Sequence, residues 1–206
     1  MTPLGTDLRP APAERVDSVR RRLGLHGPYL LGLGTVEPRK DLPTLVRAFA
    51  TLASDLPHHL VLAGLAGWDG GELAAAVAAS GVADRIVLAG YVPEADKAAL
   101  LTGADVFAYP SLYEGFGLPV LEAMACGTPA VTTTGGSLPE VAGDAATLID
   151  PGDHDALAAA IAKLAADPAA RQDAAARGLA RAATFTWERC AEQTAAAYRR
   201  AAGTMS

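Results

Sequence analysis

The chain has 206 residues, which is enough for one α/β domain with a sizeable core and too few for two complete domains of ordinary size. Half of the residues are hydrophobic, but no apolar run approaches the roughly 20 residues that a membrane-spanning helix needs. The formal net charge is −6 and Lys and Arg form no dense cluster, which argues against nucleic acid as a partner. The first residues resemble no secretory signal, so a cytoplasmic location is expected.

The chain begins with a segment that differs from its middle. Residues 1–27 combine a proline-containing stretch with a short basic helix predicted around residues 14–23, and no predicted strand pairs this segment with the rest. We therefore predict that residues 1–27 form a linker and leading helix. The main domain is predicted over residues 28–184.

Short apolar runs alternate with longer amphipathic stretches from about residue 28 to residue 164. This alternation predicts βαβ units and a parallel sheet. Strands are predicted at residues 29–34, 59–64, 85–89, 106–109, 129–133 and 146–149. Helices are predicted at residues 42–53, 71–79, 94–102, 119–125, 137–141 and 154–164. The predicted fold class is α/β: a Rossmann-like doubly wound parallel sheet of about six strands with helices on both faces.

Several predicted helices begin with capping residues. Ser137 and Glu140 fit the S-x-x-E capping box, Asp153 is placed to cap the next helix, and Pro119 suits a first helical turn. From residue 167 the chain is rich in alanine and helical, with a break predicted near residues 183–186. The final helix, within residues 185–206, carries Trp187 and Tyr198. Packing on the sheet is the favoured prediction for it, and covering something outside the domain is the alternative.

The most informative stretch of the sequence is a strand, a glycine loop and a helix over residues 106–125. In open α/β sheets ligands bind at the carboxyl ends of the strands, and a helix N-terminus there attracts phosphate. Gly115 and Gly117 would let backbone N–H groups approach a diphosphate closely. A tight turn alone would also require glycines, so the pair by itself leaves both interpretations open.

Two carboxylates flank this loop. Glu122 could accept hydrogen bonds from the two hydroxyls of a ribose, and Glu114 could face a transferred sugar. Taken singly, Glu122 could instead interact with the helix dipole, and Glu114 could be a solvated loop charge. The joint pattern E-G-F-G-L-P-x-L-E-A-M-A-x-G favours a ligand site over either of these explanations.

The E-x7-E element from Glu114 to Glu122, preceded by P-S-L-Y, resembles the family-4 retaining glycosyltransferases (glycosyltransferase group 1) of GT-B architecture. Segments around residues 34–41, 87–93 and 134–141 agree with this family in order and spacing. The resemblance implies that the chain is the C-terminal, donor-binding half of a GT-B fold. An N-terminal acceptor-binding domain would precede it in a full-length protein, and the last helix would cross back onto that domain. Peripheral contact of that protein with the inner face of the membrane stays open.

The resemblance also implies roles for individual residues. Arg39 and Lys40 would neutralise the diphosphate, also as the leaving group develops charge, and Glu114 would contact sugar hydroxyls near the reacting carbon. Thr35 stands where many relatives have an arginine, so either Arg39 replaces it or one phosphate contact is missing. The residues expected to bind the donor are Gly34, Thr35, Tyr91, Val92, Ser111, Gly115, Phe116, Gly117, Leu118 and Glu122. Tyr91 and Val92 would meet the nucleobase.

The predicted activity is hexosyl transfer with retention from a nucleotide-diphosphate sugar to a glycan or lipid-linked acceptor. The segment from Glu37 to Asp41 resembles bacterial mannosyl- and rhamnosyltransferases, which favours GDP-mannose over UDP-sugars. No cofactor and no metal are expected, because the two cations and the helix N-terminus can stabilise the diphosphate. An NAD site is disfavoured because its G-x-G-x-x-G fingerprint fails at Glu37. The alternative function is a non-catalytic module that binds a nucleotide or nucleotide sugar.

Overall fold

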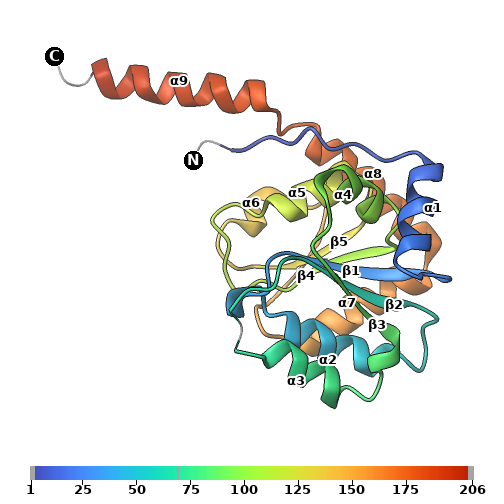
Figure 1. Ribbon diagram of the computed structural model, residues 1–206. Coiled ribbons are helices and arrows are strands. Elements are labelled where there is room, and N and C mark those ends of the chain that lie inside the picture. Colours follow the sequence, from blue (N-terminus) through green and yellow to red (C-terminus); the bar gives the residue numbers. More distant parts are fainter. Residues whose placement is uncertain (1–2, 69, 204–206) are drawn as a thin grey trace.

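The computed structural model describes residues 3–68 and 70–203 and has the predicted α/β architecture (Figure 1). One parallel sheet forms its centre, with strands β1 Tyr29–Leu33, β2 His59–Ala63, β3 Ile86–Gly90, β4 Val106–Tyr109, β5 Ala130–Thr133 and β6 Thr147–Ile149. The strands lie in the order β3-β2-β1-β4-β5-β6. The order reverses between β1 and β4, so these neighbouring strands form the topological switch point of a doubly wound sheet.

Helices cover both faces of this sheet (Figure 1). They are α1 Ala13–Arg22, α2 Leu42–Leu52, α3 Glu72–Ala79, α4 Glu94–Thr102, α5 Leu118–Ala125, α6 Leu138–Ala142, α7 His154–Ala166, α8 Pro168–Ala182 and α9 Trp187–Gly203. The predicted strands and helices agree with these bounds to within a residue or two. Within the described ranges, no helix is both long enough and apolar enough to cross a membrane.

The side chains of each strand alternate between two hydrophobic cores. Leu31 and Phe107 point to the face covered by α1, α4, α5 and α6, whereas Leu30 and Val106 point to the face covered by α2, α3 and α7. Strands buried on both faces explain why the sequence shows continuous apolar runs instead of alternation with polar residues. Tyr109, the last residue of β4, belongs to the first of these faces and lies at the switch point.

Helix α1 packs against α4. Val19 is buried in the core, and Asp96 of α4 accepts hydrogen bonds from Arg15 at 2.5 Å and from Arg22 at 2.6 Å. These contacts attach the leading segment to the domain. The boundary between residues 27 and 28 stays a prediction.

The two C-terminal helices behave differently. Helix α8 packs against α5 and α7, as expected for an alanine-rich helix. Helix α9 instead extends away from the body of the domain (Figure 1), and Trp187 and Tyr198 are exposed. The favoured prediction that the last helix packs on the sheet is therefore wrong, because the chain turns outward at the predicted break. Helix α9 meets the domain at its start, where Arg189 and Gln193 line a pocket together with Phe116.

One predicted cap is confirmed and another is wrong. The Asp153 carboxylate accepts a hydrogen bond from Ala156 N at 2.8 Å, which caps α7. Ser137 makes no capping bond at α6, and its hydroxyl instead donates to the carbonyl of Gly115 at 2.8 Å. A contact with another loop has taken the hydroxyl that local sequence assigned to the helix.

Candidate functional site

The loops that follow β1 and β4 meet at the switch point. Leu112 N donates to the carbonyl oxygen of Arg39 at 2.8 Å, and the Ser111 hydroxyl lies 2.9 Å from the same oxygen. The first loop makes a short 3-10 turn, Pro38–Lys40, and ends at Asp41, whose left-handed backbone (φ 46°) begins α2. This turn brings two consecutive cations, Arg39 and Lys40, against the glycine loop.

Glu114 is the centre of the resulting cluster. Its Oε1 atom accepts hydrogen bonds from Lys40 Nζ at 2.6 Å, Arg39 Nη1 at 2.7 Å, Ser111 Oγ at 2.7 Å and Tyr109 Oη at 2.8 Å. Lys40 also contacts the Tyr109 hydroxyl and lies over the Tyr109 ring. One carboxylate oxygen therefore binds four donors from both loops.

Burial and charge act in opposite directions on Glu114. Only 7% of the residue is exposed, and this burial favours the protonated carboxyl. The hydrogen bonds from Lys40, Ser111 and Tyr109 outweigh it, so the pKa of Glu114 lies below its usual value. Burial and the neighbouring Glu114 charge raise the pKa of Tyr109, which keeps the phenol protonated as a donor. The cluster is thus a carboxylate paired with two cations.

The cations differ in their exposure. The Lys40 side chain is 8% exposed, whereas that of Arg39 is 47% exposed and also contacts Glu37 at 3.0 Å. The Arg39 guanidinium can therefore contact an anion outside the cluster, whereas the buried Lys40 ammonium contributes its positive charge from inside the cluster. Gly34 has φ 154°, a backbone conformation that favours glycine, and a Cβ atom there would make only an ordinary contact with the Lys40 side chain at 3.6 Å.

A third loop, after β5, holds the glycine loop in place. Glu114 forms an isolated parallel bridge with Gly136, and Ser137 N donates to the carbonyl of Glu114 at 2.9 Å. A Cβ atom on Gly136 would lie 2.3 Å from that carbonyl oxygen, so only glycine fits there. The backbone of Glu114 is thereby fixed independently of its side chain.

The glycines of the second loop have different structural reasons. Gly117 has φ 97°, precedes α5, and a Cβ atom on it would lie 2.6 Å from Leu138. A Cβ atom on Gly115 would contact nothing within 4 Å, so the fold does not require glycine at this position. Within the described chain, the N–H groups of Gly115, Phe116 and Gly117 donate no hydrogen bond. These N–H groups and the first turn of α5 form a cradle suited to an anion.

Glu122 lies in a separate cluster. Its Oε1 atom is 2.6 Å from Lys97 Nζ, and Lys97 also lies 2.8 Å from Glu94 on the same helix, α4. The structure thus places the two glutamates of the E-x7-E element in different ion pairs. Burial raises the pKa of Glu122, and the hydrogen bond from Lys97 opposes that rise.

The remaining predicted residues differ in how deeply they are buried and in what they contact. Tyr91 is exposed in the loop before α4, next to Val92. Ser111 is fully buried and binds Glu114, and Leu118 packs against the core. Thr35 lies beside the loop after β2, where a Cβ atom on Gly67 would come within 3.2 Å of it.

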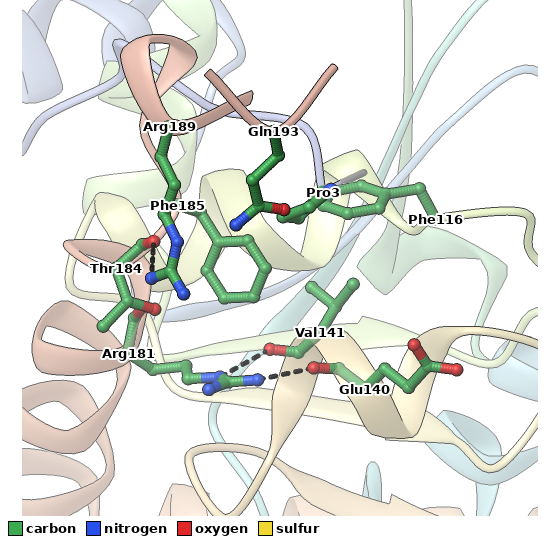
Figure 2. A pocket seen from close by; sticks show the side chains of 9 residues that line it. All are labelled: Pro3, Phe116, Glu140, Val141, Arg181, Thr184, Phe185, Arg189 and Gln193. Atoms are coloured by element: carbon green, nitrogen blue, oxygen red, sulfur yellow. Dashed lines mark hydrogen bonds between the residues drawn. The ribbon is translucent and has the colours of Figure 1, made fainter. Parts of the chain in front are cut away.

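The Phe116 side chain lines a pocket of about 300 Å³ (Figure 2). Its ring meets Phe185 edge-on, with 6.0 Å between the centroids. Arg181 lies over the Phe185 ring and donates to the carbonyls of Val141 and Glu140. The Phe116 side chain thus belongs to this aromatic pocket, while its backbone belongs to the glycine loop.

Two residues of the site were missed by the sequence interpretation. Tyr109 looks like an ordinary strand residue, although a polar aromatic at the carboxyl end of a buried strand is a signal for the switch point. Lys97 lies on a predicted helix, and nothing in its local sequence indicates that it reaches Glu122. Across the described ranges, no group of three or more His, Cys, Asp and Glu side chains is arranged to hold a metal ion.

The fold and this site define a Rossmann-like domain with an anion cradle at its switch point. Residues 17–181 match the family described as Glycosyl transferases group 1, and the chain belongs to this family. The predicted family is confirmed, as is the predicted fold, which similar solved structures show to be one half of a GT-B fold.

Individual relatives extend this comparison. The chain is 44% identical over 173 residues to O-antigen chain mannosyltransferase B of Escherichia coli. The matched region covers 83% of this chain and 45% of that protein. Sucrose-phosphate synthase of Thermosynechococcus elongatus has a TM-score of 0.84 at 30% identity, covering 98% of this chain and 52% of that one. HepE of Anabaena, solved with UDP-glucose, has a TM-score of 0.85 at 23% identity and covers 96% and 56%, which shows the fold alone. The chain thus spans about half the length of these proteins.

Proposed function

We propose that the chain is the donor-binding domain of a retaining glycosyltransferase that takes a hexosyl group from a nucleotide-diphosphate sugar. The observation that carries this proposal is the pairing of Arg39 and Lys40 with Glu114 beside the N–H groups of the glycine loop. Two cations and a helix N-terminus at one switch point offer positive charge and N–H donors to a diphosphate, and Glu114 offsets part of that charge until the ligand binds. They would also stabilise the negative charge that develops as the nucleotide leaves.

Glu114 would act mainly by arranging these cations. A carboxylate oxygen that already accepts four hydrogen bonds is a weak nucleophile, which disfavours a covalent sugar intermediate on Glu114. Retention would then follow from attack on the face that the nucleotide leaves, with the departing phosphate accepting the proton of the acceptor hydroxyl. The second Glu114 oxygen would remain for a sugar hydroxyl. Arg39, exposed beside it, would supply the contact that Thr35 cannot.

We propose GDP-mannose as the donor because the 44% identical relative is named a mannosyltransferase. The acceptor would be a glycan or a lipid-linked glycan, bound by an N-terminal domain of the full-length protein, as the length of the relatives suggests. No metal is needed in this proposal, since the cations already neutralise the diphosphate.

Calorimetric titration of the chain with GDP, UDP, ADP, GDP-mannose and UDP-glucose, first without metal, tests this proposal. GDP and GDP-mannose should bind most tightly. Lys40→Ala and Arg39→Ala should each weaken binding by about ten-fold, equivalent to roughly 1.4 kcal/mol. Lys163→Ala, which removes an exposed lysine of α7, is the matched control and should bind as the wild-type chain does.

Three outcomes would change this conclusion. Binding that depends strongly on added Mg²⁺ would contradict the metal-free site. Unchanged affinity in both cation variants would contradict the placement of the diphosphate. Tight nucleotide binding by a full-length protein that transfers no sugar would favour the alternative, a non-catalytic binding module.

A further inference from the structure

Among the described residues, Lys97 is the one that links Glu122 of α5 to the neighbouring helix α4 by an ion pair. Its ammonium lies between two carboxylates, 2.6 Å from Glu122 of α5 and 2.8 Å from Glu94 of α4. The side chains of Lys97 and Glu122 are 16% and 13% exposed, whereas that of Glu94 is 75% exposed. Lys97 is therefore held from the solvent side by Glu94 and from the inside by Glu122.

This arrangement controls both the charge and the direction of Glu122. Burial alone favours a protonated carboxyl, and a protonated carboxyl accepts hydrogen bonds from two hydroxyls poorly. The positive charge of Lys97 favours the ionised form. Because Lys97 binds Oε1 alone, it also leaves Oε2 as an acceptor, and a carboxylate fixed by a charged hydrogen bond loses less rotational freedom on binding a ligand.

We propose that Lys97 is a positioning residue that keeps Glu122 oriented to accept hydrogen bonds from the ribose hydroxyls of the nucleotide. This inference rests on the proposed function, because it requires a nucleotide in the glycine-loop cradle. On this proposal, α4 contributes to nucleotide binding in two ways. The exposed Tyr91 lies in the loop before it, and the Lys97 ammonium on it determines how strongly Glu122 binds the ribose.

Few other charged or titratable groups of the described chain lie close enough to Glu122 to affect its charge. The charged groups facing it are Lys97 and Glu94, both from α4. Cys126 follows one turn later, directly after α5, and burial raises the pKa of its thiol to about 11, so the thiol stays neutral. The segment before α1 contributes Arg9, whose backbone oxygen lies 3.7 Å from the Cys126 sulfur. Lys97 is thus the cation that contacts Glu122 directly.

The test compares GDP with 2′,3′-dideoxy-GDP, which lacks both ribose hydroxyls, in calorimetric titrations of the wild-type chain and of Lys97→Met. The methionine keeps most of the side-chain volume and removes the charge. Lys97→Met should weaken GDP binding by about ten-fold, the size of one charged hydrogen bond. It should change the already weaker binding of dideoxy-GDP less than about two-fold, because that ligand makes no contact with Glu122.

Two further measurements separate positioning from a purely structural ion pair. Lys97→Arg, which keeps the charge, should restore GDP affinity to within about three-fold of wild type. The loss in Lys97→Met should be larger near pH 6 than near pH 8, since Glu122 without its cation protonates at higher pH. A structural ion pair would lower the melting temperature of Lys97→Met without either ligand dependence or pH dependence of its affinity.

The outcomes distinguish this inference from the proposed function. If Lys97→Met weakens the binding of GDP and of dideoxy-GDP equally, or changes neither affinity, the inference is overturned while the proposed nucleotide binding stands. The same holds if the wild-type chain binds both ligands equally. If the wild-type chain binds none of GDP, UDP and ADP, the proposed function fails and the role of Lys97 fails with it.

Discussion

At the scale of single residues, the site depends on one carboxylate oxygen. Oε1 of Glu114 joins the loop after β1, through Arg39 and Lys40, to the end of β4, through Tyr109. Lys40 is buried, and a buried ammonium without a counter-charge is costly. Glu114 therefore contributes to stability as well as to the proposed chemistry.

Glu114→Gln should lower the free energy of unfolding by about 3 kcal/mol at pH 7, because it leaves Lys40 without its buried counter-charge. The pKa of Glu114 is lowered in the folded protein, so its contribution is complete above the unfolded value of about 4.5 and is lost as the pH falls through the folded value. Urea unfolding from pH 7 downward should show wild type and variant converging in acid. Glu192→Gln, at an exposed position of α9, is the control and should match wild type throughout. A difference that stays constant with pH would contradict this role.

At the scale of elements, the glycine loop and α5 show which features follow from local sequence and which depend on tertiary contacts. The E-x7-E spacing predicted one ligand site containing both glutamates, and the structure has two ion pairs, one at each end of the element. Their cations come from α4 and from the turn before α2. No local pattern could pair them, because the partners lie 74 and 25 residues away in the chain.

The two glycines of this loop should respond differently to a methyl group. Gly117→Ala should destabilise the chain by about 2 kcal/mol, because φ is positive and the new Cβ would meet Leu138. Gly115→Ala should leave stability within about 0.5 kcal/mol of wild type and still weaken nucleotide binding, because its Cβ would occupy space at the cradle. Urea unfolding and calorimetric titration with GDP measure the two effects. Equal losses of stability in both variants would show that the loop requires both glycines for folding alone.

At the scale of the whole molecule, the domain is complete without its last helix. Phe185 is buried against the core just before the chain turns outward, and none of the described α9 residues is buried. The core therefore ends near residue 185. Trp187 and Tyr198 of α9 are exposed, in keeping with the proposed N-terminal domain.

A chain ending at Thr186 should keep the thermal midpoint of the full chain to within about 2 °C, since none of the described α9 residues is buried. Phe185→Ala, the control that removes a core side chain instead, should cost about 3 kcal/mol and lower the midpoint markedly. Scanning calorimetry of both measures the difference. A large loss on removing α9 would show that α9 stabilises the domain.

The sequence by itself determined the α/β class, the six strands, the cradle loop and the family. These features depend on local periodicity, glycines and a motif of short range, which a linear chain displays directly. Only the tertiary structure decided that Tyr109 donates to Glu114 and that Lys97 pairs with Glu122. It also decided that Ser137 binds Gly115 instead of capping its helix, and that α9 leaves the domain. Each of these depends on which distant atoms the fold brings within hydrogen-bonding distance, and such partners leave no trace in the local pattern.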